Sequence, residues 1–152
     1  MKYTLFSLAF LLFISCSDDN NTSNKDYRVE NDQEIVDYLS ANNLNAEKSN
    51  SGLYYVIDEP GTGEQPTNTS NVTVKYKGYL TNGDVFDQSN ASGYTTNLQQ
   101  VIPGWTEGIT YFKEGGSGIL LIPAHLGYKN RTIGIISPGS VLIFDINLIS
   151  VN

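Results

Sequence analysis

The stretch "NVTVKYKGYLTNGDVFDQS", residues 71–89, constrains the fold of this chain more than any other. Apolar, aromatic or small residues occupy every second position from Val72 to Gly78, and two lysines lie among the positions between them. This spacing is typical of a strand with one buried face and one wet face. The pair Asn82-Gly83 is a strong hairpin signal, and the chain then returns through "VFDQS". The stretch therefore predicts two antiparallel strands joined by a tight turn.

Three more segments have the composition of strands. They are residues 52–58, 118–123 and 140–151, which are rich in β-branched and aromatic residues. A short helix is expected at residues 103–112, because proline, its first residue, is favoured in the first turn of a helix. Gly104 would let this helix come close to the sheet. About five strands and one short helix predict an α+β domain, in which an antiparallel sheet wraps around the helix.

A second short helix is expected nearer the N-terminus. In "NDQEIVDYLSANNL", Ile35, Val36 and Leu39 fall on one helical face, which predicts a helix over residues 32–41. Asn31 would be its N-cap, with Glu34 completing a capping box. This helix is far shorter than those that hold dimers together, so a packing or spacing role in a monomer is expected.

The first residues have the layout of a secretory signal. Lys2 precedes an apolar run of ten residues, which is short for a membrane-spanning helix and ends in "ISCS". "FISC" resembles a bacterial lipobox, which implies that Cys16, the only cysteine, is the lipidated first residue of the mature protein. The resulting prediction is an exported lipoprotein of the outer membrane, on its periplasmic side or at the cell surface; a retained membrane anchor is the alternative. The expected organisation is a signal peptide at 1–15, a flexible tether at 16–28, a helical segment at 29–50 and a folded domain at 51–152.

Composition argues against several classes of function. The net charge is −7 and the chain has no basic cluster, which is unfavourable for nucleic-acid binding. A single histidine, His125, and a single cysteine provide neither a metal-ligand cluster nor a paired nucleophile and base. No phosphate-binding or cofactor motif is present, so no metal and no cofactor are expected. An enzyme with this composition would have to work by shape and desolvation.

Four segments occur in a fixed order: "VTVKYKGYLTNGDVFDQS", "VIPGWTEGI", "LLIPAHLGY" and "GIISPGSVLIFDINLI". Together they resemble the FKBP-type peptidyl-prolyl cis–trans isomerases, over residues 52–151. The resemblance implies the same sheet-around-helix fold and catalysed rotation about X–Pro bonds without a covalent step. It further implies proline-containing polypeptides as substrates, macrolides as possible inhibitors, and a role in the folding of exported proteins at the cell envelope.

The resemblance also implies a site, residue by residue. Asp87, the Tyr128 hydroxyl and the backbone N–H of Ile102 would act on the substrate amide. Aromatic and branched side chains would bind the prolyl segment; they are Tyr76, Phe86, Tyr94, Val101, Trp105, Ile135, Ile136 and Phe144.

One departure from the family pattern keeps a second interpretation open. The family usually has glycine after the loop tyrosine, whereas Lys129 follows Tyr128 here. A different path of this loop is therefore expected. The alternative function is a binding module or chaperone of low activity that docks proline-containing segments of an envelope partner. A purely structural lipoprotein is a third possibility, against which the aromatic set argues.

Overall fold

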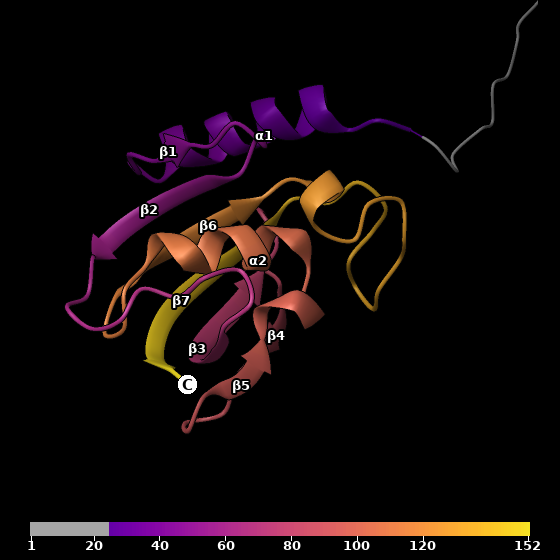
Figure 1. The fold of residues 1–152 in the computed structure, drawn as a ribbon. Helices are drawn as coiled ribbons and strands as arrows, with labels where there is room; N and C mark the ends of the chain where they lie inside the picture. Colours follow the sequence, from indigo (N-terminus) through magenta and orange to yellow (C-terminus); the bar gives the residue numbers. More distant parts are fainter. Residues whose placement is uncertain (1–24) are drawn as a thin grey trace, which may run out of the picture.

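The computed structural model describes residues 25–152 (Figure 1). The predicted signal peptide, Cys16 and most of the predicted tether lie outside the described residues. Within them, the chain forms two α-helices, three 3-10 turns and seven strands. In chain order these are α1 (Arg28–Ala41), β1 (Glu47–Lys48), β2 (Tyr54–Glu59), β3 (Asn71–Tyr79), β4 (Val85–Gln88), β5 (Tyr94–Asn97), η2 (Leu98–Gln100), α2 (Pro103–Gly108), η3 (Ile109–Tyr111), β6 (Ser117–Ile122), η4 (Ala124–Leu126) and β7 (Leu142–Val151).

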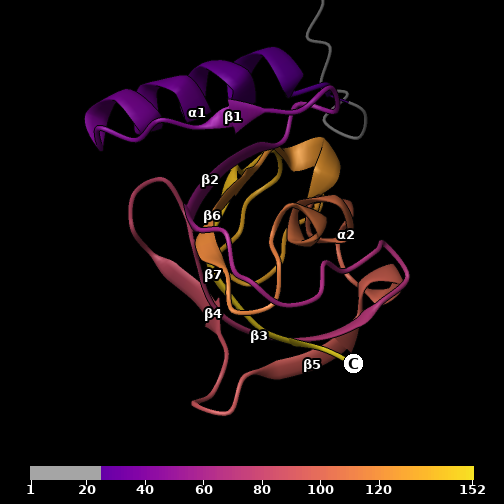
Figure 2. The same ribbon diagram turned by 60° about the vertical axis from the view of Figure 1, so that its left-hand side comes forward.

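All strand pairs are antiparallel, and the strands form one sheet in the order β1-β2-β6-β7-β3-β4. β5 pairs with β3 beside the β4 pairing. The strongly curved sheet wraps around α2, whereas α1 lies on its outer side (Figure 2). The predicted α+β class and the sheet wrapped around a short helix are thus confirmed.

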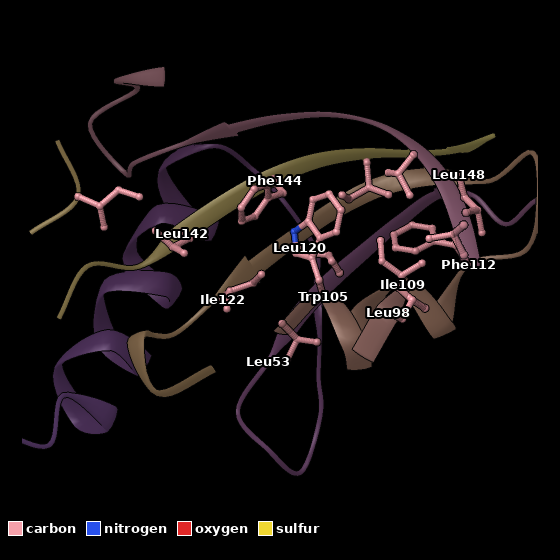
Figure 3. Close-up of a cluster of buried hydrophobic side chains, with 14 residues drawn as sticks. Leu53, Leu98, Trp105, Ile109, Phe112, Leu120, Ile122, Leu142, Phe144 and Leu148 are labelled. Carbon is pink, nitrogen blue, oxygen red and sulfur yellow. The ribbon is translucent and has the colours of Figure 1, made fainter. Parts of the chain in front are cut away.

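Each face of the sheet buries its own apolar cluster. The inner cluster includes Trp105 and Ile109 from the α2 region and Phe144 from β7 (Figure 3). The outer cluster packs Ile35 of α1 against Ile143 of β7 and neighbouring strands. Successive side chains of β7 therefore point alternately into the inner and the outer cluster, which explains why the first residues of this strand are all apolar.

The strand count differs from expectation. The five predicted strands correspond to β2, β3, β4, β6 and β7, and the sheet adds β1 and β5. The additional strands have two and four residues. In the predicted hairpin, the Gly83 N–H donates to the Leu80 carbonyl over 2.8 Å. Only Gly83 in this turn has a positive φ, so glycine is needed at one position of the turn.

The capping prediction for Asn31 is wrong. α1 begins at Arg28, one turn before the expected start, and its N-cap position is Tyr27. The Arg28 N–H instead donates a hydrogen bond to the Asp26 carboxylate, at 3.0 Å. Asn31 lies inside the helix and is buried, with its carboxamide directed to distant backbone groups.

No helix in the described part of the chain has the length and apolar composition needed to cross a membrane.

Candidate active site

A cavity of about 1170 Å³ opens between the inner face of the sheet, the start of α2 and the loop that joins η4 to β7. Every residue that the sequence singled out for substrate contact lines it. These residues are Tyr76, Phe86, Asp87, Tyr94, Val101, Ile102, Trp105, Tyr128, Ile135, Ile136 and Phe144. The structure thus brings together side chains from β3, β4, β5, α2, β7 and the loop, across 69 positions of sequence from Tyr76 to Phe144.

Four aromatic rings form the closed end of the cavity. The Trp105 ring stands nearly perpendicular to Tyr76, with centroids 5.0 Å apart, and to Phe144, at 5.3 Å. Phe86 meets Phe144 edge-on at 5.4 Å. Edge-to-face contacts of this kind are favourable because the ring edge is positive and the ring face negative. The interlocked rings therefore hold one another in fixed orientations.

Gly78 makes room for this cluster. A β-carbon at this position would lie 2.6 Å from the Phe86 ring and 2.8 Å from the Phe144 ring, which is closer than non-bonded carbon atoms approach one another. Strand register places Gly78 opposite Phe144 on one side and Asp87 on the other. The two rings thus occupy the space that a side chain at Gly78 would fill.

Asp87 and Tyr76 form a polar pair at the edge of the rings. The Tyr76 hydroxyl donates to Asp87 Oδ2 at 2.7 Å, and the Gln88 N–H donates to Asp87 Oδ1 at 2.9 Å. Burial raises the pKa of the Tyr76 hydroxyl, and its hydrogen bond to Asp87 raises that pKa further. Tyr76 therefore stays protonated at neutral pH and orients the exposed carboxylate of Asp87.

The start of α2 presents a free donor to the cavity. Ile102 is the N-cap residue of α2, and its carbonyl accepts from the Trp105 N–H at 2.9 Å. Among residues 25–152, no group accepts a hydrogen bond from the Ile102 N–H. As expected, Gly104 brings the helix close to the sheet, since a β-carbon there would lie 2.5 Å from Ile122 of β6.

The loop forms the opposite wall. Ile133 and Ile136 exchange two backbone hydrogen bonds, of 3.0 and 2.9 Å, around a tight turn. This turn buries Ile136, with 3% of its surface exposed, and leaves Ile135 54% exposed at the rim. The Tyr128 hydroxyl has no hydrogen-bond partner within the described residues. It is therefore available to donate into the cavity.

Lys129 follows Tyr128 in the left-handed region, with φ of 58°. A lysine therefore holds the backbone conformation that glycine adopts most easily. Its N–H donates to the Ala124 carbonyl at 2.8 Å, and its carbonyl accepts from the Gly139 N–H at 2.8 Å. These two bonds fix the base of the loop.

Sequence reasoning missed other lining residues, among them Val85, Arg131 and Ile133. Arg131 and Lys129 are exposed cations on a loop without acidic residues, and the Arg131 guanidinium lies 5.8 Å from the centre of the Tyr128 ring. A signal was available for Ile133, because three isoleucines cluster around Gly134 in a segment expected to be a loop, where apolar residues suggest a contact surface. Arg131 gave no comparable signal.

Within residues 25–152, no group of three or more His, Cys, Asp or Glu side chains is placed to hold a metal ion.

Comparison with known proteins agrees with this geometry. A family profile described as FKBP-type peptidyl-prolyl cis-trans isomerase matches residues 62–149. A probable FKBP-type peptidyl-prolyl cis-trans isomerase, FkpA, of Neisseria meningitidis serogroup B is 47% identical over 104 residues, covering 66% of this chain and 38% of that protein. The outer membrane protein MIP of Legionella longbeachae is 44% identical over 104 residues, covering 66% of this chain and 45% of that protein.

Among solved structures, FkpA from Escherichia coli aligns with a TM-score of 0.73 and 36% identity, covering 82% of this chain and 61% of that one. The chain spans less than half the length of the two curated relatives. The match of the family profile to more than half of the chain, together with the sheet wrapped around α2, shows that this chain belongs to the FKBP-type peptidyl-prolyl cis–trans isomerase family.

Proposed function

We propose that this chain catalyses rotation about peptide bonds that precede proline, in proline-containing segments of exported polypeptides. The observation that carries the proposal is the cavity closed by Tyr76, Phe86, Trp105 and Phe144. A prolyl ring is apolar and compact, and four interlocked aromatic rings provide a preformed surface for it.

The chemical problem is rotation about a partial double bond. Resonance sets a barrier of about 18–20 kcal/mol. Uncatalysed exchange at X–Pro bonds therefore takes on the order of tens to hundreds of seconds. Twisting the bond breaks the resonance and reduces the charge separation of the amide. An apolar cavity accordingly favours the twisted amide over the planar one, and each 1.4 kcal/mol of such preference is worth about tenfold in rate.

Two free donors can orient the substrate within this cavity. The Ile102 N–H would donate to one substrate carbonyl, and the Tyr128 hydroxyl to another. Asp87, held by Tyr76, would place its carboxylate beside the carbonyl carbon of the twisted bond and polarise it. None of these steps requires a covalent intermediate or a bound metal.

An NMR exchange experiment on a short X–Pro peptide tests the proposal. The expected result is that catalytic amounts of the protein accelerate cis–trans exchange, and that a macrolide inhibitor of this family abolishes the acceleration. Macrolide binding without accelerated exchange would instead favour the low-activity binding module. If the protein neither binds the macrolide nor accelerates exchange, the proposed use of the cavity is overturned.

We further propose that the protein works in the cell envelope as an outer-membrane lipoprotein anchored through Cys16. The apolar run before "SC" supports this location, and a relative carries the name outer membrane protein MIP. Radiolabelled fatty acid should enter the wild-type protein and Ser17→Ala, but not Cys16→Ala. Equal labelling of all three proteins would exclude this anchor.

A further inference from the structure

Asn31 makes contacts that its place in a helix does not explain. Only 1% of its surface is exposed. Its Nδ2 donates to the Gly139 carbonyl at 2.8 Å, and its Oδ1 accepts from the Ala124 N–H at 2.8 Å. Both partners are backbone groups more than 90 residues away in the sequence. One carboxamide thus joins α1 to both ends of the loop that forms the second wall of the cavity.

These bonds close a ring that includes Lys129. The Lys129 N–H donates to the Ala124 carbonyl, and the Gly139 N–H donates to the Lys129 carbonyl, each at 2.8 Å. Asn31 bonds the remaining polar groups of Ala124 and Gly139. The four residues are therefore linked in a closed circuit of hydrogen bonds, in which the left-handed Lys129 lies opposite Asn31.

A second contact keeps α1 against the end of the same loop. Gly139 packs so closely on the Tyr27 ring that a β-carbon there would lie 2.3 Å from it. The N-terminal end of α1 reaches this loop, whereas its C-terminal end lies toward β1 (Figure 1). The helix outside the sheet thus contacts the loop through Asn31, in its first turn, and through Tyr27, the residue before it.

We propose that Asn31 is a positioning residue for the cavity: by holding Ala124 and Gly139 together it fixes Lys129 and, with it, the adjacent Tyr128. This inference rests on the proposed function. Without the carboxamide, the loop would lose two side-chain bonds that bridge its two ends. Tyr128 would then sample orientations in which its hydroxyl does not meet a bound substrate, and misplacement of such a group lowers rate steeply.

Asn31→Leu tests the proposal, because leucine is close in size to asparagine and makes neither hydrogen bond. The expected result is that kcat/KM for an X–Pro peptide falls about tenfold in the folded protein. Exchange of the Lys129 and Gly139 amide protons, followed by NMR, should accelerate, while amides of β3 and β7 stay protected. Asn31→Ser, whose hydroxyl is too short to make either bond at its present length but keeps the position polar, should give a change in the same direction.

Glu34→Ala is the matched control. It removes another hydrogen bond between α1 and the rest of the domain, which the Thr81 hydroxyl donates to Glu34 at 2.7 Å, but it does not touch the loop. This variant should keep the wild-type kcat/KM and the wild-type exchange of the Lys129 amide. If Asn31→Leu does not fold, the kcat/KM and the Lys129 amide exchange of Asn31→Ser are compared with those of Glu34→Ala to test the role of Asn31.

The two readouts separate failure of this inference from failure of the proposed function. An inactive wild-type protein would reject the isomerase, whereas amide exchange at Lys129 would still test the role of Asn31. Unchanged exchange at Lys129 and Gly139 in folded Asn31→Leu or Asn31→Ser would overturn the inference. The same holds if Glu34→Ala lowers kcat/KM as much as the Asn31 variants, because a merely structural role of α1 gives that outcome.

Discussion

The two walls of the cavity are made in different ways. On the sheet side, Tyr76, Phe86 and Phe144 lie on hydrogen-bonded strands, and their rings contact one another or Trp105. On the loop side, residues 127–136 are mostly exposed; they are held by backbone bonds and the Asn31 carboxamide at the base, by one tight turn and by the buried Ile136. One wall therefore belongs to the core, whereas the other is attached to it.

This difference separates two tasks. The apolar environment that disfavours the planar amide comes from residues whose loss would damage the fold. Charge and shape at the rim come from residues that can change at little cost in stability, as exposed positions generally can. Substitutions in the two walls should accordingly differ in how they divide their effect between folding and activity.

The largest effect is expected from Phe144→Ala. Removing a buried phenylalanine side chain costs about 3–5 kcal/mol of unfolding free energy. This is a large share of the roughly 5–15 kcal/mol that holds a domain together. Urea denaturation measures the loss, and activity should fall with it. The unfolding free energy of Ile135→Ala, in the opposite wall, should stay within about 0.5 kcal/mol of the wild-type value. Equal losses for the two variants would remove the distinction between the walls.

Asp87→Val should lower activity without unfolding the protein. The carboxylate is exposed, and its main contact is the Tyr76 hydroxyl. We expect kcat/KM for an X–Pro peptide to fall about tenfold, the equivalent of 1.4 kcal/mol. The urea midpoint should change little. Asp58→Val, at an exposed position on β2, is the control that should leave both quantities at their wild-type values.

A smaller effect is expected from the charges of the loop wall. Lys129 and Arg131 should favour peptides that carry glutamate rather than glutamine near the proline. Reversing both charges, in Lys129→Glu with Arg131→Glu, should reduce this preference about threefold, as exposed charge pairs contribute less than about 1 kcal/mol. High salt should abolish the difference.

The matched control for charge reversal lies on the outer face of the sheet. Lys75→Glu with Lys77→Glu changes the net charge equally, on the face of β3 opposite Tyr76 and outside the cavity lining. The glutamate preference should survive in this double variant. Its loss there would mean that overall charge, rather than the loop wall, attracts acidic peptides.

The smallest effect is expected from Lys129→Gly. A left-handed φ costs a side-chain-bearing residue about 1 kcal/mol or more, while glycine loses more entropy on folding. The two effects together predict that Lys129→Gly raises the unfolding free energy by about 0.5 kcal/mol, which would be visible as a slightly higher Tm. Lys113, whose φ is not positive, serves as the comparison, and Lys113→Gly should not raise Tm. A lower Tm for Lys129→Gly would show that the lysine side chain stabilises the loop.

The sequence predicted the sheet wall well and the loop wall less well, for physical reasons. Alternation along β3 and β7 is a local property that survives into the structure, so their faces could be assigned directly. β1 and β5 are short and polar, and they exist because β2 and β3 offer them partners. The residues around the cavity came from the family resemblance rather than from periodicity.

Asn31 shows where local reasoning stops. An asparagine three residues before a glutamate fits a capping box, and the pattern contains nothing about residues 124 and 139. The partners become neighbours only once β7 has been placed in the sheet. Likewise, the left-handed conformation of Lys129 follows from bonds to Ala124 and Gly139, because lysine itself has no preference for it.

The place of β7 in the sheet also bears on the order in which the fold can be completed. This strand, residues 142–151, lies between β6 and β3 and pairs with both along most of its length. A chain that emerges from its N-terminus can form the β3–β4 hairpin early, but the middle of the sheet is vacant until these residues arrive. Synthesis and any export through a narrow channel would therefore proceed with the chain still open, and the cavity would be completed in one late step.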